Sequence, residues 1–293
     1  MSIKLLLIFV TVYKEGSITT AAKRLHLSQP AVSAAIREIE NRYAVQLFKR
    51  LGRGIQKTNA AHHLYEYASH ITALYTEMEN EFSNQDKNSH LRIGSSISIG
   101  TCLMPKYIKE YTDTYHAPLP YVKIDSSDII ENMVLDNSLD FALIEGWIHS
   151  DKLMAEPLIK DKLILICSPK HPLAVKEWVT LEELQEEHFL LREKNSGTRE
   201  YAEIALRLHD FVLKPSWEST STTAIINAVI ANLGISILPE RMLTEYINNM
   251  SITKLQIKDI DFLREYNIIY HQNKYLNSDI INFIDLVKMD IAL

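Results

Sequence analysis

Cysteine is scarce in this chain of 293 residues, which contains only Cys102 and Cys167. The two lie far apart and form no CxxC motif, so the sequence offers neither a disulfide framework nor a thiolate metal site. We interpret them as small buried side chains of a reduced protein, with a disulfide or a redox sensor as the alternative. Nothing in the sequence indicates disordered or repetitive segments.

The motifs of common enzymes are missing too. The sequence contains no phosphate-binding loop, no dinucleotide fingerprint, no Gly-x-Ser-x-Gly elbow and no HExxH. Its eleven histidines are scattered, and the adjacent pair His62 and His63 has the wrong spacing for two metal ligands. We therefore expect no enzymatic activity, no cofactor and no metal ion.

Long hydrophobic runs are absent. Residues 5–10 mimic a signal peptide, but the run is short, lacks a cleavage site and is interrupted by Tyr13-Lys14-Glu15. Its apolar residues fit one face of a helix instead. No stretch approaches the roughly 18 apolar residues of a membrane span. We expect a soluble, cytoplasmic protein that makes no membrane contact.

Charge is distributed very unevenly. The first sixty residues hold ten Lys and Arg but only three acids, a net charge of +7, whereas the remaining residues carry −13. A basic head of this kind suits a polyanion, and the acidic body does not.

The head, residues 1–58, reads as a helix-turn-helix. Gly16 and Ser17 end the first helix and cap the second, while Ser28 caps a third helix with Pro30 in its first turn. The core stripe of the third helix is Val32, Ile36 and Ile39.

Another face of the third helix carries Gln29, Ser33 and Arg37 at spacings of four residues. These side chain types suit the base edges of a major groove, although they could also be solvated residues of a helical bundle. Two glycines between basic residues in 49–58 then predict a β-hairpin, or wing, whose cations reach phosphates or the minor groove.

The head resembles the DNA-binding domain of LysR-type transcriptional regulators. The resemblance is carried, without a gap, by Phe9, Val12, Gly16-Ser17, Ala21-Ala22, Leu25, Ser28 to Ser33, Ile36, Ile39-Glu40, Leu47 to Arg50 and Thr58. Two departures are Ile39, where the family usually has Leu, and Ala60-Ala61, where it usually has Gly. The resemblance implies DNA contacts by Ser28, Gln29, Pro30, Ser33, Arg37, Arg50, Arg53 and Lys57.

Residues 59–88 follow as one long amphipathic helix. Apolar residues recur every three or four positions at Leu64, Tyr67/Ala68, Ile71, Leu74/Tyr75, Met78 and Phe82. Such a seam most often pairs with another helix, and the alternative is that it packs on its own chain. The family resemblance favours a homodimer formed by this helix, and two dimers as a homotetramer.

The body, residues 89–293, alternates strand and helix patterns in two sets, which predicts parallel sheets covered by helices. It resembles the two-lobed α/β effector domain of the same family, built like a type 2 periplasmic binding protein. The resemblance implies lobe I at 89–162 and 266–293, lobe II at 163–265, and a small-molecule effector in the cleft between them.

Two stretches rich in hydroxyl groups, residues 95–101 and 195–199, precede predicted helices and suit an anion. Simple helix capping is the alternative for both, and Arg199 could instead pair with Glu203. The predicted ligand-binding residues are Ser95, Ser96, Ser98, Thr101, Trp147, Ser196, Thr198, Arg199 and Thr220. The Ser-Gly-Thr-Arg stretch also resembles a LysR-type subgroup associated with sulfur, nitrogen and carbon-fixation metabolism.

These patterns favour a sequence-specific transcriptional regulator controlled by a small anionic metabolite. Its partners would be double-stranded promoter DNA with an inverted repeat, the effector, and RNA polymerase. The alternative is a non-enzymatic small-molecule-binding protein with only architectural DNA binding.

Overall fold

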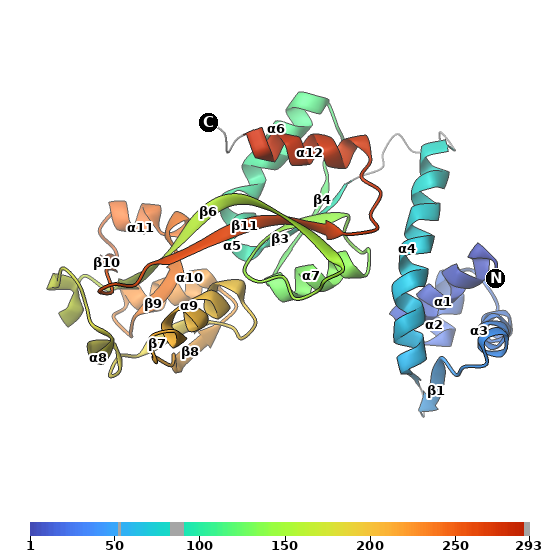
Figure 1. Ribbon diagram of the computed structural model, residues 1–293, viewed down its shortest axis with the longest axis horizontal. Helices are drawn as coiled ribbons and strands as arrows, with labels where there is room; N and C mark the ends of the chain where they lie inside the picture. The colour runs from blue at the N-terminus through green and yellow to red at the C-terminus, as the bar shows by residue number, and fades with distance from the viewer. Residues whose placement is uncertain (52–53, 83–90, 290–293) are drawn as a thin grey trace. The chain divides into compact units, whose positions relative to one another are not determined.

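The computed structural model describes residues 1–51, 54–82 and 91–289 (Figure 1). The chain divides into two compact units, one formed mainly by the head and the helix that follows it, the other mainly by the body. Each unit is described by itself below.

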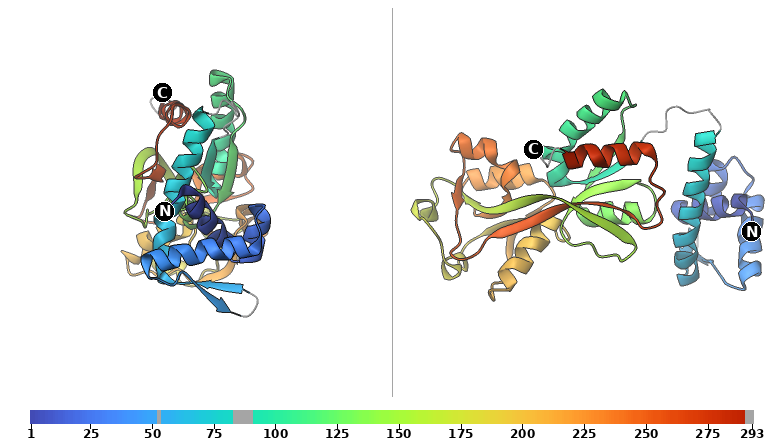
Figure 2. Two further views of the ribbon diagram at one scale, coloured as in Figure 1. Left: turned by 90° about the vertical axis from the view of Figure 1, so that its right-hand side faces the viewer. Right: turned by 45° about the horizontal axis from the view of Figure 1, so that its top comes forward.

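Three helices and a hairpin form the head. They are α1 (Ile3–Glu15), α2 (Ile18–Arg24), α3 (Gln29–Tyr43) and the strands β1 (Phe48–Leu51) and β2 (Gly54–Lys57), which pair antiparallel. In the left view of Figure 2 the hairpin projects from the helices. Phe9, Val12 and Ile39 are fully buried at the centre. The predicted helix-turn-helix and wing are thus present.

The predicted caps explain where these helices begin and end. The Ser17 hydroxyl accepts a hydrogen bond from the Thr20 amide at 3.2 Å, and the Ser28 hydroxyl accepts one from the Ala31 amide at 3.3 Å. Gly16 adopts the left-handed conformation, with φ of 61°, and so stops α1 at little steric cost. Short polar side chains and one glycine therefore set the turns between the three helices.

Glu40 fixes the chain between α3 and the wing. Its Oε1 atom accepts hydrogen bonds from the backbone amides of Leu47 at 2.8 Å and Phe48 at 3.3 Å. At the other end of the hairpin, the Thr58 hydroxyl donates to the carbonyl oxygen of Leu47 at 3.0 Å. Both ends of the wing are therefore tied to one point next to the head core.

The helix α4 (Asn59–Phe82) carries two apolar stripes. One stripe, Ala61, Tyr65 and Ala68, is buried in the head core, and the Tyr65 ring stacks on Tyr13 with 3.8 Å between ring centroids. The other stripe is exposed and consists of Tyr67, Ile71, Leu74, Met78 and Phe82. We call it the outer stripe. Of the predicted seam, Leu64 and Ala68 pack on their own chain in the head core, whereas the residues of the outer stripe do not contribute to that core. The predicted end of the helix near residue 88 lies outside the described residues.

One lobe of the body is built on parallel strands. They are β3 (Arg92–Ser96), β4 (Tyr121–Asp125) and β5 (Phe141–Glu145), with β3 in the middle. The surrounding helices are α5 (Ile97–Cys102), α6 (Met104–Tyr115), α7 (Ser127–Leu135) and α12 (Ser278–Met289). Figure 1 shows α6 and α12 side by side, and Tyr111 contacts Phe283 between them. We keep the name lobe I for this part.

Two long strands, β6 (Leu153–Cys167) and β11 (Phe262–His271), connect lobe I to the second lobe (Figures 1 and 2). They pair antiparallel with each other, and β11 is antiparallel to β5. The described sheet of seven strands is therefore mixed. The expectation of parallel sheets is wrong here, because a chain that leaves a lobe on one strand must return on another that runs the opposite way.

The second lobe, lobe II, surrounds the far ends of β6 and β11. Its strands are β7 (Phe189–Arg192), β8 (Pro215–Ser219), β9 (Ser236–Pro239) and β10 (Thr253–Leu255). Its helices are α8 (Leu181–Leu184), α9 (Gly197–Arg207), α10 (Thr222–Ile230), α11 (Thr244–Asn248) and the 3-10 turns η1 (Pro172–Val175) and η2 (Glu240–Met242). Two core clusters flank its strands. Among the described residues no helix could span a membrane.

We expect Glu40→Ala to destabilise the wing by about 1–3 kcal/mol, because two amides of buried residues lose their acceptor. Hydrogen exchange of the head amides in the full chain measures this effect. Glu38→Ala, which removes the same charge from an exposed position of the same helix, is the matched control. Equal protection in both variants would contradict the role of Glu40.

Candidate functional site

The first candidate site is the exposed surface of α3. Gln29, Pro30 and Arg37 are exposed there, and Ser28 caps the helix at its N-terminus. Amide and guanidinium groups on one helix surface can read base edges, and the helix N-terminus favours a phosphate. This surface therefore has the chemistry that the sequence predicts for a DNA contact.

Ser33, which was predicted to lie on that surface, is largely buried instead. It is only 7% exposed, and its hydroxyl has no hydrogen-bond partner among the described residues. Position 33 lies about 60° from Ile36 around the helix, at 3.6 residues per turn, and so borders the core stripe. A short side chain there is covered, whereas the longer Arg37, almost directly above it, reaches solvent.

The wing cations are described only in part. The Lys57 ammonium lies 4.1 Å from the centroid of the Tyr13 ring, so this half-buried side chain packs inside the head. Arg50 contributes its backbone to β1, and Arg53 lies outside the described residues. The structure therefore places Lys57 against an aromatic ring and leaves the roles of the two arginines as predictions.

The second candidate site lies where lobes I and II meet. Five of the predicted ligand-binding residues are buried there or beside it, namely Ser95, Ser96, Ser98, Ser196 and Thr198. Three others, Thr101, Trp147 and Thr220, are exposed. The strand ends of lobe I and the start of α9 from lobe II form this region, which we call the effector cleft after the cleft predicted from the sequence, although these five residues are packed between the lobes.

Glu145 is at the centre of the effector cleft, although the sequence did not single it out as a ligand-binding residue. It ends β5 and is only 3% exposed. Its carboxylate accepts hydrogen bonds from the hydroxyls of Ser96 and Ser98, the latter at 3.1 Å. The hydroxyls predicted to meet a ligand are thus engaged by a carboxylate of the chain itself.

Arg264, on β11, supplies the positive charge of the cleft. Its side chain is fully buried. Its Nε atom donates to Asp161 Oδ2 at 2.8 Å, its Nη1 atom donates to Thr198 Oγ1 at 3.1 Å, and Nη1 lies 3.6 Å from Glu145 Oε1. Lobe I, lobe II and both connecting strands therefore meet at one guanidinium group.

The backbones of the two lobes also approach closely at this point. A Cβ atom placed on Gly197, at the start of α9, would lie 2.7 Å from the Glu145 carbonyl oxygen and 2.9 Å from the Ser127 hydroxyl. Ser127 itself donates to that carbonyl oxygen at 3.0 Å. A glycine is therefore required where lobe II touches the end of β5.

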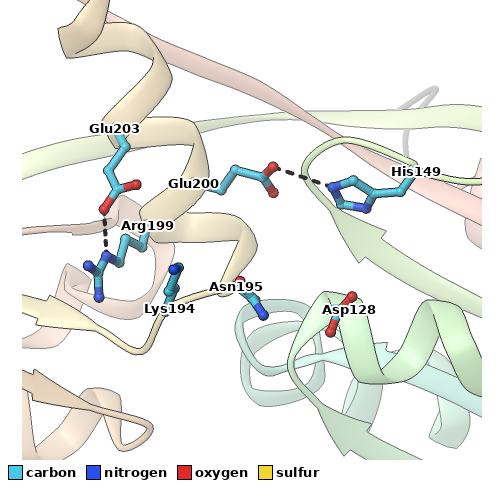
Figure 3. Close-up of a pocket in the computed structure, with 7 residues that line it drawn as sticks. All are labelled: Asp128, His149, Lys194, Asn195, Arg199, Glu200 and Glu203. Atoms are coloured by element: carbon cyan, nitrogen blue, oxygen red, sulfur yellow. Dashed lines mark hydrogen bonds and ion pairs between the residues drawn. The ribbon is translucent and has the colours of Figure 1, made fainter.

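Beside this contact lies a pocket with a volume of about 270 Å³, drawn in Figure 3. Its lining residues are Asp128, His149, Lys194, Asn195, Arg199, Glu200 and Glu203. Arg199 Nε donates to Glu203 Oε1 at 2.6 Å, and the guanidinium also pairs with Glu218. The alternative considered for Arg199, an ion pair with Glu203, is confirmed.

His149 bridges the lobes at the rim of this pocket. Its Nδ1 atom lies 3.0 Å from Glu131 of lobe I, and its Nε2 atom lies 3.4 Å from Glu200 of lobe II. The hydrogen bond to Glu131, opposed by burial and aided by Glu200, raises the pKa of His149 above its ordinary value. Among the described residues no group of three or more His, Cys, Asp and Glu could hold a metal ion.

We expect the imidazole pKa of His149 to exceed its model-peptide value of about 6.5. A raised pKa stabilises the fold below the pKa of the unfolded chain, and the contribution is lost as pH rises through the folded value. NMR titration of the imidazole measures the pKa, and His149→Gln should reduce the pH dependence of stability in this range. His209→Gln is the control, and the same change in both variants would contradict the bridge.

Comparison with known proteins adds the family. The family described as "Bacterial regulatory helix-turn-helix protein, lysR family" matches residues 3–62, and "LysR substrate binding domain" matches residues 84–291. An uncharacterized HTH-type transcriptional regulator of Escherichia coli K12, YeiE, is 32% identical over 285 residues, which cover 97% of this chain and 96% of the relative. Both the head and the body are thus matched.

Solved structures show the same fold. Full-length OxyR from Pseudomonas aeruginosa, in a variant form, has a TM-score of 0.75 at 19% identity and covers 100% of this chain and 95% of its own. The regulatory domain of Synechocystis PCC6803 CcmR in complex with 2-PG has a TM-score of 0.64 at 23% identity, covering 69% of this chain and 97% of that one. With the two family matches, these findings show that the chain belongs to the LysR family of DNA-binding transcriptional regulators.

Proposed function

We propose that this regulator responds to a small anion bound in the effector cleft and reads an inverted repeat in promoter DNA as a dimer. The observation that carries the effector class is the set of donors around Glu145. Ser96, Ser98 and Arg264 surround a carboxylate, which is the chemistry that an anionic ligand requires. No chemical reaction is needed for this function.

The proposed effector site extends from this cluster toward α9. Thr198 is in the first turn of α9, an eleven-residue helix whose N-terminus favours negative charge. The CcmR regulatory domain was solved with 2-PG, which supports a small-molecule ligand for the related domain here. The Ser196-Gly197-Thr198-Arg199 stretch further supports the subgroup associated with sulfur, nitrogen and carbon-fixation metabolism, and hence effectors drawn from such anions.

For DNA we propose that α3 enters the major groove. Exposed Gln29 and Arg37 would contact bases, and Ser28 with the helix N-terminus would contact a phosphate. Arg50 and Arg53 of the wing would contact the backbone or minor groove. The charges of the two parts support this assignment, since the first sixty residues carry +7 and the rest −13.

We propose that the outer stripe of α4 forms the dimer. Its five large apolar side chains are exposed, and Phe82 is 80% exposed, which is unfavourable for an isolated helix in water. Pairing two such helices buries both stripes and places two heads on one duplex. A homotetramer of two dimers, contact with RNA polymerase and a cytoplasmic location complete the proposal.

We expect Arg37→Ala to reduce binding to the cognate operator by about 1–3 kcal/mol, because one base contact is lost. The operator is first selected from a random-sequence DNA pool, and affinity is then measured by fluorescence anisotropy at fixed salt. Arg207→Ala, which removes a cation from α9 of the body, is the matched control. Unchanged affinity of the Arg37 variant would exclude α3 as the reading helix.

We expect Leu74→Asp to shift the protein from dimer toward monomer, because a charge would be buried at the centre of the paired helices. Leu74 is half exposed in a single chain, so the substitution leaves the fold of the chain intact. Sedimentation velocity measures the shift. Thr76→Asp places the same charge on another face of α4 and should remain dimeric; dissociation by both variants, or by neither, would argue against the outer stripe.

A further inference from the structure

We infer that the Glu145 carboxylate is a tethered anion that fills the anion subsite of the effector cleft, so that an effector binds by displacing it. This inference rests on the effector site proposed above and adds how that site is regulated. It makes Glu145 the residue that sets both the affinity and the selectivity of the cleft.

The first argument is what the donors of the cleft bind. Ser96 and Ser98 come from the junction of β3 and α5, and both are 1% exposed. A buried carboxylate is unfavourable unless hydrogen bonds and opposite charge replace its water shell. Two hydroxyls and a nearby guanidinium provide that replacement for Glu145. The group of donors is therefore already shown to accommodate a carboxylate.

The second argument is that Glu145 is not needed to neutralise Arg264. Asp161 already does so through a hydrogen-bonded ion pair at 2.8 Å, whereas the distance from Arg264 Nη1 to Glu145 is 3.6 Å, too long for a hydrogen bond. Arg264 Nη2 is buried and has no hydrogen-bond partner among the described residues. An unused donor thus remains on the cation of the subsite, which a ligand with more oxygens than a carboxylate could engage.

The third argument is that a cavity next to the cluster can accommodate the displaced Glu145 side chain. A separate pocket of about 480 Å³ lies next to the cluster and is lined in part by Gly146, Lys160 and Arg264. Gly146 directly follows Glu145 and has φ of 99°, a conformation that residues with a side chain rarely adopt, and the wide backbone freedom of glycine allows the chain next to Glu145 to rearrange. We place the displaced carboxylate in this pocket, whose charged lining residues are Lys160, Arg264 and the acid Glu265.

Displacement of the Glu145 carboxylate would also affect the contact with lobe II. The Glu145 carbonyl oxygen lies against Gly197 at the start of α9, with no room for a Cβ atom between them. Thr198, the next residue, accepts the hydrogen bond from Arg264. The exchange of one anion for another therefore occurs at the contact that positions α9 on lobe I.

The test replaces the tethered anion with a free one. In the full chain, Glu145→Ala should bind acetate, giving a saturable rise in melting temperature of about 3–6 °C at tenfold its dissociation constant. Wild type should show no rise beyond that of chloride at equal ionic strength. The rise should vanish when Ser96→Ala and Ser98→Ala are added. An equal response of wild type and Glu145→Ala would overturn the inference.

Glu145→Gln keeps the shape of the side chain and serves if the alanine variant does not fold. Its neutral amide competes less well than a carboxylate, so inorganic sulfate should bind it at least about tenfold more tightly than wild type in calorimetry. Equal or weaker binding refutes the tethered anion. If wild type binds sulfate as tightly as Glu145→Gln does, and this binding requires Ser96 and Ser98, the proposed effector site stands but the inference about Glu145 fails. If sulfate binding in every variant is independent of the two serines, both the effector site and the inference fail.

Discussion

The ion pair between Arg264 and Asp161 is the interaction on which the body depends. Arg264 is fully buried, and an uncompensated guanidinium in that position would cost several kcal/mol. Its partners come from different parts of the chain: Asp161 from the other connecting strand and Thr198 from lobe II. Because separating the lobes would leave this charge without part of its compensation, their contact is specified by electrostatics as well as by packing.

Close backbone contact acts at the same point. Gly197 lets the start of α9 lie directly on the end of β5, and Gly146 turns the chain immediately after it. Neither the polar cluster nor this contact would be stable alone, since the cluster needs exclusion of water and the contact needs its polar groups satisfied. Polar contacts and close backbone packing therefore both act at this part of the junction between the lobes, which suits the proposed effector site, where a ligand would change lobe contacts.

Local patterns in the sequence were sufficient for much of the fold. Gly16, Ser17 and Ser28 act through neighbours within four residues, so the helices of the head could be predicted from the local amino-acid sequence alone. The strands β8 and β10 cannot be recognised from periodicity, because their residues, mostly exposed or partly exposed, show no clear alternation and pair with distant segments. The full length of β6 is hidden in the sequence for a similar reason, since its largely exposed first half lacks a hydrophobic run.

For several polar contacts in the candidate site, the sequence predicted one of the two partners but not the other. Ser96, Ser98 and Thr198 were identified as hydroxyls near helix starts, but their partners Glu145 and Arg264 are 47 to 66 residues away in sequence. Glu145 ends a run of four apolar residues, which is the one local signal that an acid was being buried. Arg264 lies in an alternating strand and gives no such signal. Contacts between residues so distant in sequence depend on the topology of the fold, which the periodicity of the sequence does not reveal.

The position of α4 then decides how a change at the proposed dimer interface would reach the DNA-binding head. Its inner stripe is part of the head core, and the stack of Tyr13 on Tyr65 fixes the orientation of α1 against it. The His62 ring lies 2.6 Å from the Tyr13 hydroxyl and adds a polar contact to the same junction. Because α4 and the head share one core, a shift between two α4 helices paired as proposed would move each head as a rigid body. Spacing between the two α3 helices, rather than their internal structure, is therefore the quantity that the proposed dimer would vary.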